Sequence, residues 1–354
     1  MRVAILGAGM IGAVHRRAAL LSGAQVVGVL ASTPESSRRV AAEWGVPALE
    51  SLDDLAALAP DVVHVCSPNG LHVEHVEAAL AAGAHVICEK PLSVDAADAE
   101  RLVDAAQAAS RVATVPFVYR FHPLVREIRA RVQAGEFGAW QLLHGSYLQD
   151  WLLSPDATSW RVDSALGGAS RTFADIGSHW CDLMEFVTGE RIASVSAEMT
   201  TTIPERAGVA VTTEDAAIVT FRTHSGVLGS VTTSQVSAGR KNRLWFEFDG
   251  ADRSAVFDQE NPETVWLGSA TSTEILHRDP STGSPEQRRL SSLPAGHAQG
   301  YAQCFENFVA DTYAAVRGES PDGLPTFADG LRSARIVDAV VESARTGTRI
   351  TVDA

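Results

Sequence analysis

The sequence predicts an α/β protein in two parts, a doubly wound parallel sheet followed by an α+β domain. Three observations support this fold class. Apolar strand-like runs alternate with helical segments up to about residue 121. After about residue 122 the pattern changes, and residues 192–290 are mostly strands joined by short turns. The length of 354 residues suits two domains of roughly 100–200 residues each. We expect the domains to be 1–121 and 122–354.

The elements of the first domain follow from apolar runs and from residues that begin and end helices. Thr33 with Pro34 marks the start of one helix, and Gly83 marks the end of another. Parallel neighbours need a helical crossover, so the alternation predicts a parallel sheet. The expected strands are 2–6, 25–30, 61–66, 86–88 and 112–119, and the expected helices are 13–21, 34–44, 52–58, 73–82 and 95–109.

The second domain shows the alternation typical of a sheet with two different faces. Leu244, Phe246 and Phe248 alternate with Trp245 and Glu247. Short turns such as 224–226 favour antiparallel neighbours. The expected strands include 216–222, 227–233 and 242–248, and the expected helices are 123–133, 173–187, 299–316 and 328–344.

Composition excludes several classes of function. The net charge of −14 opposes binding to nucleic acid or to an anionic membrane surface. The N-terminus lacks the pattern of a secretory signal, and no apolar stretch approaches the ~18–20 residues that span a bilayer. Cys66, Cys88, Cys181 and Cys304 show no metal-ligand spacing, so we expect structural thiols, no metal site and a cytoplasmic location.

A glycine motif, G-x-G-x-x-G, connects the first strand to the first helix. Gly7 permits the tight turn, Gly9 lets backbone amides approach a pyrophosphate, and Gly12 allows close helix–strand packing. Met10 and Ile11 lie within the motif, where the helix N-terminus favours negative charge. The motif therefore predicts dinucleotide binding.

Two further polar segments follow predicted strands at their carboxyl ends. Ser67 and Asn69 follow one strand, and Glu89-Lys90-Pro91 follows the next. A lone Lys-Pro pair is more simply a surface lysine before a loop proline. However, ligands of open α/β sheets bind at the carboxyl ends of strands, where the glycine loop also lies. We therefore interpret Lys90 as a functional residue.

A third candidate lies on the helix predicted over 173–187. Asp175 and His179 are four residues apart, so they share one face near the helix N-terminus. The simpler interpretation is a capping carboxylate and a structural histidine. Together with Lys90 and the glycine motif, the pair favours acid/base chemistry, because imidazole exchanges protons near neutral pH.

These motifs, taken together, resemble the Gfo/Idh/MocA family of NAD(P)-dependent oxidoreductases over essentially the whole chain. The resemblance rests on Gly7-x-Gly9-x-x-Gly12, Ser67-Pro68-Asn69-x-x-His72, Glu89-Lys90-Pro91 and Asp175-x-Gly177-x-His179. It implies a Rossmann domain followed by an α+β domain with a large, mostly antiparallel open sheet. In the family that sheet commonly mediates dimers or tetramers.

The resemblance also implies roles for individual residues. Lys90, His179 and Asp175 match the catalytic set. The expected cofactor contacts are Gly7, Gly9, Met10, Ile11, Gly12, Ser32, Thr33, Arg38, Ser67, Asn69, His72, Glu89 and Lys90. The expected substrate contacts are Arg120, Trp151, Trp160, Arg161, Asp175, His179 and His297. Arg171 stands where a small or neutral residue is expected, and it is expected to alter the charge preference of the pocket.

The implied reaction moves a hydride between NAD(P) and a secondary alcohol or ketone of a sugar or polyol. His179 would accept the hydroxyl proton, and the Lys90 ammonium would stabilise charge on the same oxygen. An NAD-preferring domain carries an acidic residue about 20 residues after the glycines. Ala31 takes that position, and Ser32, Thr33 and Arg38 could bind a 2′-phosphate, which favours NADP over NAD.

Other readings of the sequence stay open. An NAD-assisted glycosidase would turn over without a net NADH signal. A ligand-sensing regulator would bind a dinucleotide without turnover, although it has no need of an acid/base group. A cofactor-binding protein whose pocket is filled by a partner chain is a further alternative. The apolar pattern of 244–248 predicts a homodimer or homotetramer through the second sheet, since a monomer would expose it.

Overall fold

The computed structural model describes residues 1–353, which divide into two compact units. The first unit contains Met1–Val118 and Phe305–Ala334, and the second contains Tyr119–Cys304 and residues 335–353. This division differs from the single boundary expected at residues 121/122. Residues 305–334 return to the first unit, because the Phe305 ring packs on His15 at 4.7 Å and Tyr313 bonds His64 at 2.9 Å.

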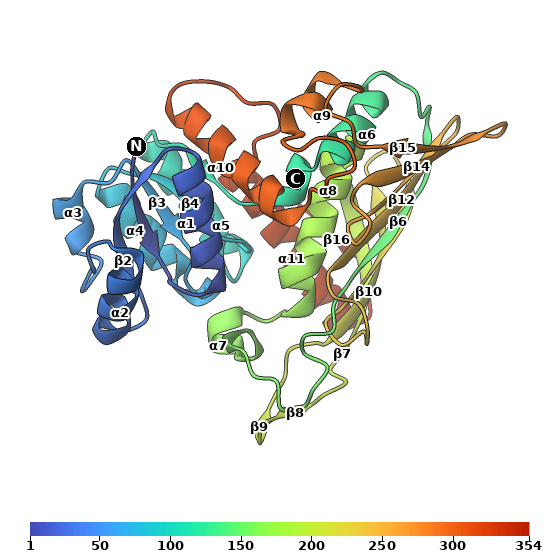
Figure 1. Ribbon diagram of the computed structural model, residues 1–354. Coiled ribbons are helices and arrows are strands. Elements are labelled where there is room, and N and C mark those ends of the chain that lie inside the picture. The colour runs from blue at the N-terminus through green and yellow to red at the C-terminus, as the bar shows by residue number, and fades with distance from the viewer. Residues whose placement is uncertain (354) are drawn as a thin grey trace. The chain divides into compact units, whose positions relative to one another are not determined.

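The first unit contains the predicted parallel sheet. Over residues 1–353 this sheet has five strands in the order β2-β1-β3-β4-β5, with helices around it (Figure 1). The strands are β1 (Arg2–Leu6), β2 (Gln25–Leu30), β3 (Val62–Val65), β4 (His85–Cys88) and β5 (Ala113–Thr114). The helices are α1 (Met10–Leu21), α2 (Pro34–Trp44), α3 (Asp54–Leu58), α4 (His72–Ala81) and α5 (Ala96–Ala108), with a 3₁₀ turn η1 (Asn69–Leu71).

Strand β1 lies between β2 and β3, so the strand order reverses there. Such a switch point opens a crevice at the carboxyl ends of the two central strands. The glycine loop follows β1, and the segment from Ser67 follows β3. The topology therefore gathers the predicted cofactor segments at one edge of the sheet.

The strand expected over 112–119 is much shorter than predicted. Only Ala113–Thr114 pairs with β4, and the N–H of Val115 donates to the carbonyl of Pro325 instead. The chain then forms a 3₁₀ turn, η2 (Val118–Phe121). Tertiary bonding from a distant segment thus overrides an apolar run that is typical of a buried strand.

The second unit is built on a large, mostly antiparallel sheet. Over residues 1–353 its nine strands run in the order β15-β14-β13-β12-β6-β11-β10-β7-β16, and β6 and β11 are parallel. They are β6 (Trp140–Leu148), β7 (Ile192–Thr200), β10 (Ala216–Thr223), β11 (Leu228–Ser234), β12 (Arg243–Gly250), β13 (Ser254–Asp258), β14 (Thr264–Gly268), β15 (Thr273–His277) and β16 (Ile350–Thr351). A separate hairpin pairs β8 (Glu205–Arg206) with β9 (Val209–Ala210).

The central strand β6 was not expected from the sequence. The strand contains Gly145, and a β-carbon there would collide with the Trp180 ring and with the carbonyl of Trp245. Glycine is a poor strand former, but here it admits a large ring to the sheet surface. Because this packing requires a glycine, the residue pattern of β6 is not typical of a strand.

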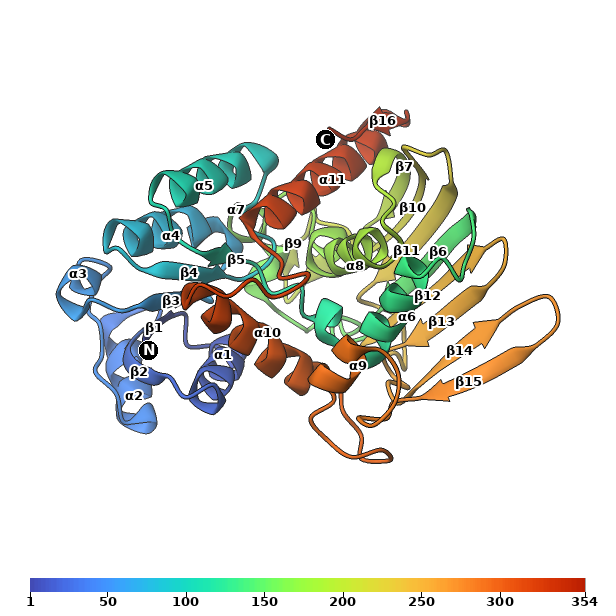
Figure 2. The same ribbon diagram turned by 90° about the horizontal axis from the view of Figure 1, so that it is seen from above.

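Helices cover one face of this sheet, as Figure 2 shows for α6 and α8. Helices of the second unit are α6 (Pro123–Gln133), α7 (Ser164–Gly167), α8 (Ser178–Thr188) and α9 (Pro285–Leu290), with short turns η3 (Trp160–Val162) and η4 (Phe173–Gly177). Two helices, α10 (Tyr301–Val316) and α11 (Phe327–Thr346), contribute residues to both units.

The alternation over 244–248 separates the two faces of the sheet. Leu244, Phe246 and Phe248 are completely buried on the helix-covered face. The expectation that they would form an exposed patch is therefore wrong. On the other face the large exposed apolar side chains include Leu142 and Ile218.

None of the helices formed by residues 1–353 combines the length and the apolar character needed to cross a membrane.

Candidate active site

The glycine loop of the first unit has the geometry of a phosphate cradle. Gly7 has φ +107°, and a β-carbon there would collide with the carbonyl of Cys66. At Gly12 it would collide with the carbonyl of Gly7. At Gly9, by contrast, a β-carbon would meet nothing within 4 Å. Gly9 caps α1 without a side-chain hydrogen bond, so the first amides of the helix face open space.

These residues fit a bound dinucleotide. The open space at Gly9 suits a pyrophosphate at the start of α1. Beside it, Ser67 Oγ is buried with no hydrogen-bond partner among residues 1–353. An unpaired buried hydroxyl is costly unless a ligand satisfies it. Asn69 is also buried, in η1, whereas Met10 is exposed and Ile11 half-buried.

The residues expected at the adenosine ribose are already engaged in local contacts. Thr33 caps α2 and shares hydrogen bonds with Ser36, at 3.1 Å from its backbone N–H. Arg38 makes two hydrogen bonds with Glu50, at 2.8 and 3.0 Å. Ser32 is exposed just before the cap. Both partners of the Arg38 ion pair are more than half exposed.

Two of the expected cofactor residues face the interior and thus differ from the expectation. His72 is fully buried, with ring nitrogens 2.9 Å from the carbonyl of Pro91 and 3.0 Å from that of Ser67. It therefore holds the two loops in place. Glu89 is also buried, with Oε1 2.9 Å from His15 Nε2. The backbone N–H of Lys90 donates to Glu89 Oε2 at 3.2 Å, and the Lys90 side chain is half-buried before a cis Pro91.

In the second unit, Asp175 is held by two side chains from distant segments. It lies in the π-helical turn η4, directly before α8. Gln235 Nε2 donates to Asp175 Oδ2 at 2.7 Å, and Arg161 Nε lies 3.6 Å from Oδ1. One carboxylate oxygen of Asp175 thus accepts a hydrogen bond from an amide, and the other lies near a guanidinium cation.

His179 lies in the first turn of α8 and is 7% exposed. Its ring is 5.3 Å from that of Tyr119 and 6.4 Å from that of Tyr147. The two tyrosine hydroxyls are 2.7 Å apart, and Tyr147 donates to Asn242 at 2.7 Å. Burial raises the pKa of Tyr119 to about 12, so its hydroxyl stays protonated at neutral pH. The imidazole is thus buried beside the two tyrosine rings.

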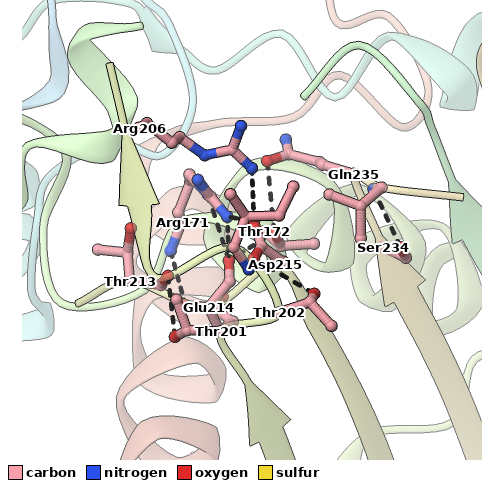
Figure 3. Close-up of polar contacts among 12 residues, drawn as sticks. Arg171, Thr172, Thr201, Thr202, Arg206, Thr213, Glu214, Asp215, Ser234 and Gln235 are labelled. Atoms are coloured by element: carbon pink, nitrogen blue, oxygen red, sulfur yellow. Dashed lines mark hydrogen bonds and ion pairs between the residues drawn. The ribbon is translucent and has the colours of Figure 1, made fainter. Parts of the chain in front are cut away.

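A buried polar cluster, shown in Figure 3, fixes the turn that carries Asp175. Glu214 Oε1 accepts hydrogen bonds from Ser170 Oγ at 2.7 Å and from the N–H of Phe173 at 2.8 Å. Asp215 accepts hydrogen bonds from the guanidinium groups of Arg171 and Arg206. Both carboxylates come from the segment before β10, so the cluster ties the sheet to η4.

Asp215 is a carboxylate despite its complete burial. Burial raises the pKa of this group, but the N–H of Ile203 and the guanidinium groups of Arg206 and Arg171 outweigh burial. The pKa of Asp215 therefore lies below its ordinary value. Arg171 was expected to alter the charge of the pocket, and this is wrong, because its side chain is fully buried and its charge is balanced by Asp215.

The other predicted substrate residues are scattered within the second unit. Arg120 is buried and makes two hydrogen bonds with Asp182, at 2.8 and 2.5 Å, so its charge serves the interior. The Arg161 guanidinium lies over the Trp160 ring at 4.5 Å, close to Asp175. The remaining two have other surroundings. Trp151 is 40% exposed and donates a hydrogen bond to Gln149, and His297 is exposed in the loop before α10.

Sequence reasoning missed the residues that support Asp175 and His179. Gln235 follows directly after β11, where a polar residue ends an otherwise ordinary strand. Glu214 and Asp215 are adjacent carboxylates before a strand of alternating burial, an unusual place for two buried charges. Only the adjacency of the two carboxylates was visible in the sequence.

The structure also places three possible metal ligands together, although none was expected. Ligand atoms of His144, Glu247 and Asp249 lie within 4.8 Å of one another on the open sheet face. All three are partly exposed, and exposed acidic groups often gather without an ion.

The first unit defines the class of protein, since a parallel sheet with a glycine cradle at its switch point binds dinucleotides. Residues 1–117 match the oxidoreductase family with an NAD-binding Rossmann fold, and residues 125–256 match the GFO/IDH/MocA C-terminal domain. The chain therefore belongs to the Gfo/Idh/MocA family and is an NAD(P)-dependent oxidoreductase.

Known relatives are similar to this chain over nearly its whole length. The chain is 31% identical to levoglucosan dehydrogenase of Pseudarthrobacter phenanthrenivorans, over 88% of this chain and 86% of that protein. It is 26% identical to inositol 2-dehydrogenase of Rhizobium meliloti, over 99% of both. A structure of levoglucosan dehydrogenase with NADH and levoglucosan superposes with a TM-score of 0.92 at 28% identity, covering 100% of this chain and 99% of that one.

Proposed function

We propose that this oxidoreductase oxidises a secondary hydroxyl of a neutral sugar or polyol, or reduces the corresponding ketone. The observation that carries the proposal is the arrangement around α8. There Asp175 is fixed by Gln235 and Arg161, and the His179 imidazole lies buried among tyrosines. Such a preorganised acid/base pair is what proton transfer from a hydroxyl requires.

The residues have distinct roles in this proposal. His179 accepts the hydroxyl proton, and Asp175 orients the substrate or the imidazole. The Lys90 ammonium donates to the same substrate oxygen and stabilises negative charge on it. Bound nicotinamide supplies the hydride acceptor, while the chain supplies position and electrostatic field.

The charges around Asp175 support a neutral substrate. Phosphate recognition uses cations that are available to the ligand. Arg161 is close to Asp175, and Arg171 and Arg206 share Asp215. The relatives include enzymes named for levoglucosan and inositol, which carry no phosphate, and also a glucose-6-phosphate 3-dehydrogenase, so this preference rests on the charges around Asp175. We therefore favour a neutral sugar over a phosphorylated one.

For the cofactor we propose a small preference for NADP over NAD. The absence of a carboxylate at Ala31 and Ser32 removes the repulsion that excludes a 2′-phosphate. Glu50 binds Arg38 and would repel that phosphate. Glu50→Gln should therefore tighten NADP binding several-fold and leave NAD binding unchanged. Clearly tighter binding of NAD by the wild-type protein would reverse this preference.

We propose a homodimer or homotetramer that covers the open face of the nine-stranded sheet. The face presents large exposed apolar side chains: Leu142, Leu228 and Ile218 on the neighbouring strands β6, β11 and β10, and Ile275 on the edge strand β15. Monomeric proteins rarely expose large apolar patches. Sedimentation that shows a monomer at micromolar concentration would contradict the assembly.

The proposed location is the cytoplasm. All four cysteines are buried free thiols, as expected in a reducing compartment.

A substrate screen tests the proposed function. The purified protein is mixed with NAD or NADP and with levoglucosan, myo-inositol, xylose or glucose 6-phosphate, and NAD(P)H formation is followed by absorbance. We expect kcat/KM for a neutral member to exceed that for glucose 6-phosphate by about 100-fold, or about 2.7 kcal/mol. Turnover only of the phosphorylated sugar, or glycoside cleavage without net NADH, would overturn the proposal.

A further inference from the structure

The hydroxyls of the two tyrosines beside His179 belong to a closed ring of hydrogen bonds that Asn242 completes. The Tyr119 and Tyr147 hydroxyls lie 2.7 Å apart. The Tyr147 hydroxyl lies 2.7 Å from Asn242 Oδ1, and Asn242 Nδ2 lies 3.1 Å from the Tyr119 hydroxyl. The tyrosines are 2% and 3% exposed, and Asn242 is half-buried directly before β12. Neither the phosphate cradle nor the support of Asp175 involves Asn242.

An indole N–H fixes the direction of this ring. Trp151 Nε1 donates to Gln149 Oε1 at 2.9 Å, and an indole nitrogen can only donate. The amide nitrogen of Gln149 therefore faces Asn242 Oδ1, at 2.8 Å. Asn242 thus presents its oxygen to Tyr147 and its nitrogen to Tyr119. Because Tyr147 donates to Asn242, the hydrogen between the two tyrosines comes from Tyr119.

Both hydroxyl hydrogens are therefore used inside the ring. Burial raises the pKa of Tyr119 to about 12 and raises that of Tyr147 well above its ordinary value, so both hydroxyls stay protonated. Neither tyrosine has a hydrogen left for a substrate oxygen. Each member of the ring donates one hydrogen bond and accepts another, and such bonds strengthen one another. The ring therefore fixes the two tyrosines and leaves proton transfer to His179.

The aromatic rings of both tyrosines lie beside the His179 imidazole. The Tyr119 ring meets it edge to face, with centroids 5.3 Å apart and planes at 81°. The Tyr147 ring lies 6.4 Å away at 46°. Aromatic pairs at such distances have preferred orientations. Rings from η2 and β6 thus restrict the rotation of an imidazole on α8, and a general base must be oriented toward the proton that it takes.

We propose that Asn242 is a positioning residue for His179. Asn242 closes the ring of hydrogen bonds, the ring holds the two tyrosines in one arrangement, and the tyrosines hold the imidazole toward the substrate hydroxyl. Asn242 is itself anchored, because its backbone N–H and that of Lys241 donate to Glu260 Oε1 at 3.2 and 2.9 Å. The inference rests on the proposed role of His179 as the acid/base group.

A double-variant cycle tests whether Asn242 acts through His179. Asn242→Leu nearly keeps the size of the side chain and removes its hydrogen bonds. For the best sugar or polyol of the substrate screen, kcat should fall about 10–100-fold, the scale of a misplaced catalytic group, while KM and NAD affinity barely change. In the His179→Ala background the same substitution should cost nothing further. Equal losses in the two backgrounds, or an unchanged kcat in Asn242→Leu alone, would overturn the proposal.

Tyr119→Phe keeps the aromatic ring beside His179 and removes only the hydroxyl, so it also serves if Asn242→Leu does not fold. We expect kcat to fall about tenfold, because the ring of hydrogen bonds is opened. A loss as large as that of His179→Ala would make the hydroxyl itself a catalytic group. No loss would make the hydrogen bonds dispensable. Either result would overturn the proposal.

Gln287→Leu is the matched control, since it also removes a side-chain amide from the second unit. Gln287 is buried, and its Nε2 donates to the carbonyls of Thr282 and Asp279 at 2.8 and 3.2 Å. This variant should lower stability and leave kcat unchanged. A loss of kcat equal to that of Asn242→Leu would mean that any lost amide explains the effect, and would overturn the proposal.

A spectroscopic test needs neither substrate nor cofactor. Carbon-13 NMR of histidine-labelled protein reports the environment of each imidazole, and the His179 signals are assigned from their absence in His179→Ala. In Asn242→Leu we expect these signals to move or broaden, because the imidazole takes several orientations. Unchanged His179 signals would overturn the proposal. If the wild type turns over no sugar, the proposed function fails, and this spectrum still decides whether Asn242 positions the imidazole.

Discussion

The two units prepare their sites by different physical means. In the first unit, the glycine loop leaves space by lacking side chains, and backbone amides at the start of α1 face that space. In the second unit, Gln235 donates a hydrogen bond to Asp175 and Arg161 lies close to it, while buried charged groups such as Glu214 hold the turn that carries it. An added side-chain atom should disturb the glycine loop, whereas loss of a charge or a hydrogen bond should disturb the support of Asp175. Substitutions of these two kinds therefore test the two sites separately.

The largest effect on activity is expected at His179. His179→Ala should lower kcat by about 10²–10⁴, because a general base is lost, and should flatten the pH–rate limb near neutrality. His144→Ala removes a half-exposed histidine of the open sheet face and is the control. Steady-state rates across the pH range check both variants. Equal losses in the two variants would remove His179 from the mechanism.

The largest effect on stability is expected at Asp215. Asp215→Asn leaves the buried Arg171 and Arg206 without their carboxylate, which should cost about 3–5 kcal/mol of unfolding free energy. Because the folded pKa of Asp215 is depressed, its contribution is complete above about pH 4 and is lost as pH falls below that value. Denaturant titrations of both proteins at several acidic pH values measure this. A variant that keeps the full acid sensitivity would contradict the pairing.

A smaller effect on activity is expected at Gln235, whose neutral side-chain amide donates a hydrogen bond to Asp175. Gln235→Leu removes the 2.7 Å hydrogen bond to the carboxylate and should lower kcat/KM by about 10–100-fold, the scale of a hydrogen bond to a charged group. Gln287→Leu also removes a buried glutamine, but one that bonds loop carbonyls near α9. The control should lose stability and keep kcat/KM. Similar kcat/KM in both variants would show that Asp175 needs no such support.

The smallest effect is expected from one added methyl group at the phosphate cradle. Gly9→Ala meets no atom within 4 Å in the protein, and its φ of −74° suits alanine, so stability should not change. A bound pyrophosphate would meet the methyl group, and NAD affinity should fall about tenfold, or 1.4 kcal/mol. Calorimetric titration and thermal unfolding measure the two quantities. Unchanged affinity would place the pyrophosphate elsewhere.

The same contrast explains how much of the molecule was predictable. The glycine loop, Thr33 and Glu89-Lys90-Pro91 are short contiguous motifs, and each has a local backbone reason for its residues. Their elements and the parallel sheet were predicted in order, and the family comparison and the structure search confirm the fold class. Their side-chain directions were not predicted, since His72 and Glu89 turn inward to partners that lie far along the chain.

The support of Asp175 could not be predicted, because its members meet only after folding. Asp175 lies 60 residues from Gln235 along the chain, and Arg171 lies 44 residues from Asp215. No local pattern records such pairings. Arg171 illustrates the consequence, since a charge interpreted as part of the pocket is neutralised in the interior.

The central claim is that Lys90 and His179 act on one substrate oxygen. It is tested most directly by kcat and the NAD dissociation constant of Lys90→Met, His179→Ala and the double variant. We predict that Lys90→Met lowers kcat by roughly 10²–10³ and barely alters NAD affinity. The double variant should be no worse than slightly below the poorer single variant, because both residues serve one proton and one oxygen. Additive losses, or near-full turnover in Lys90→Met, would contradict the claim.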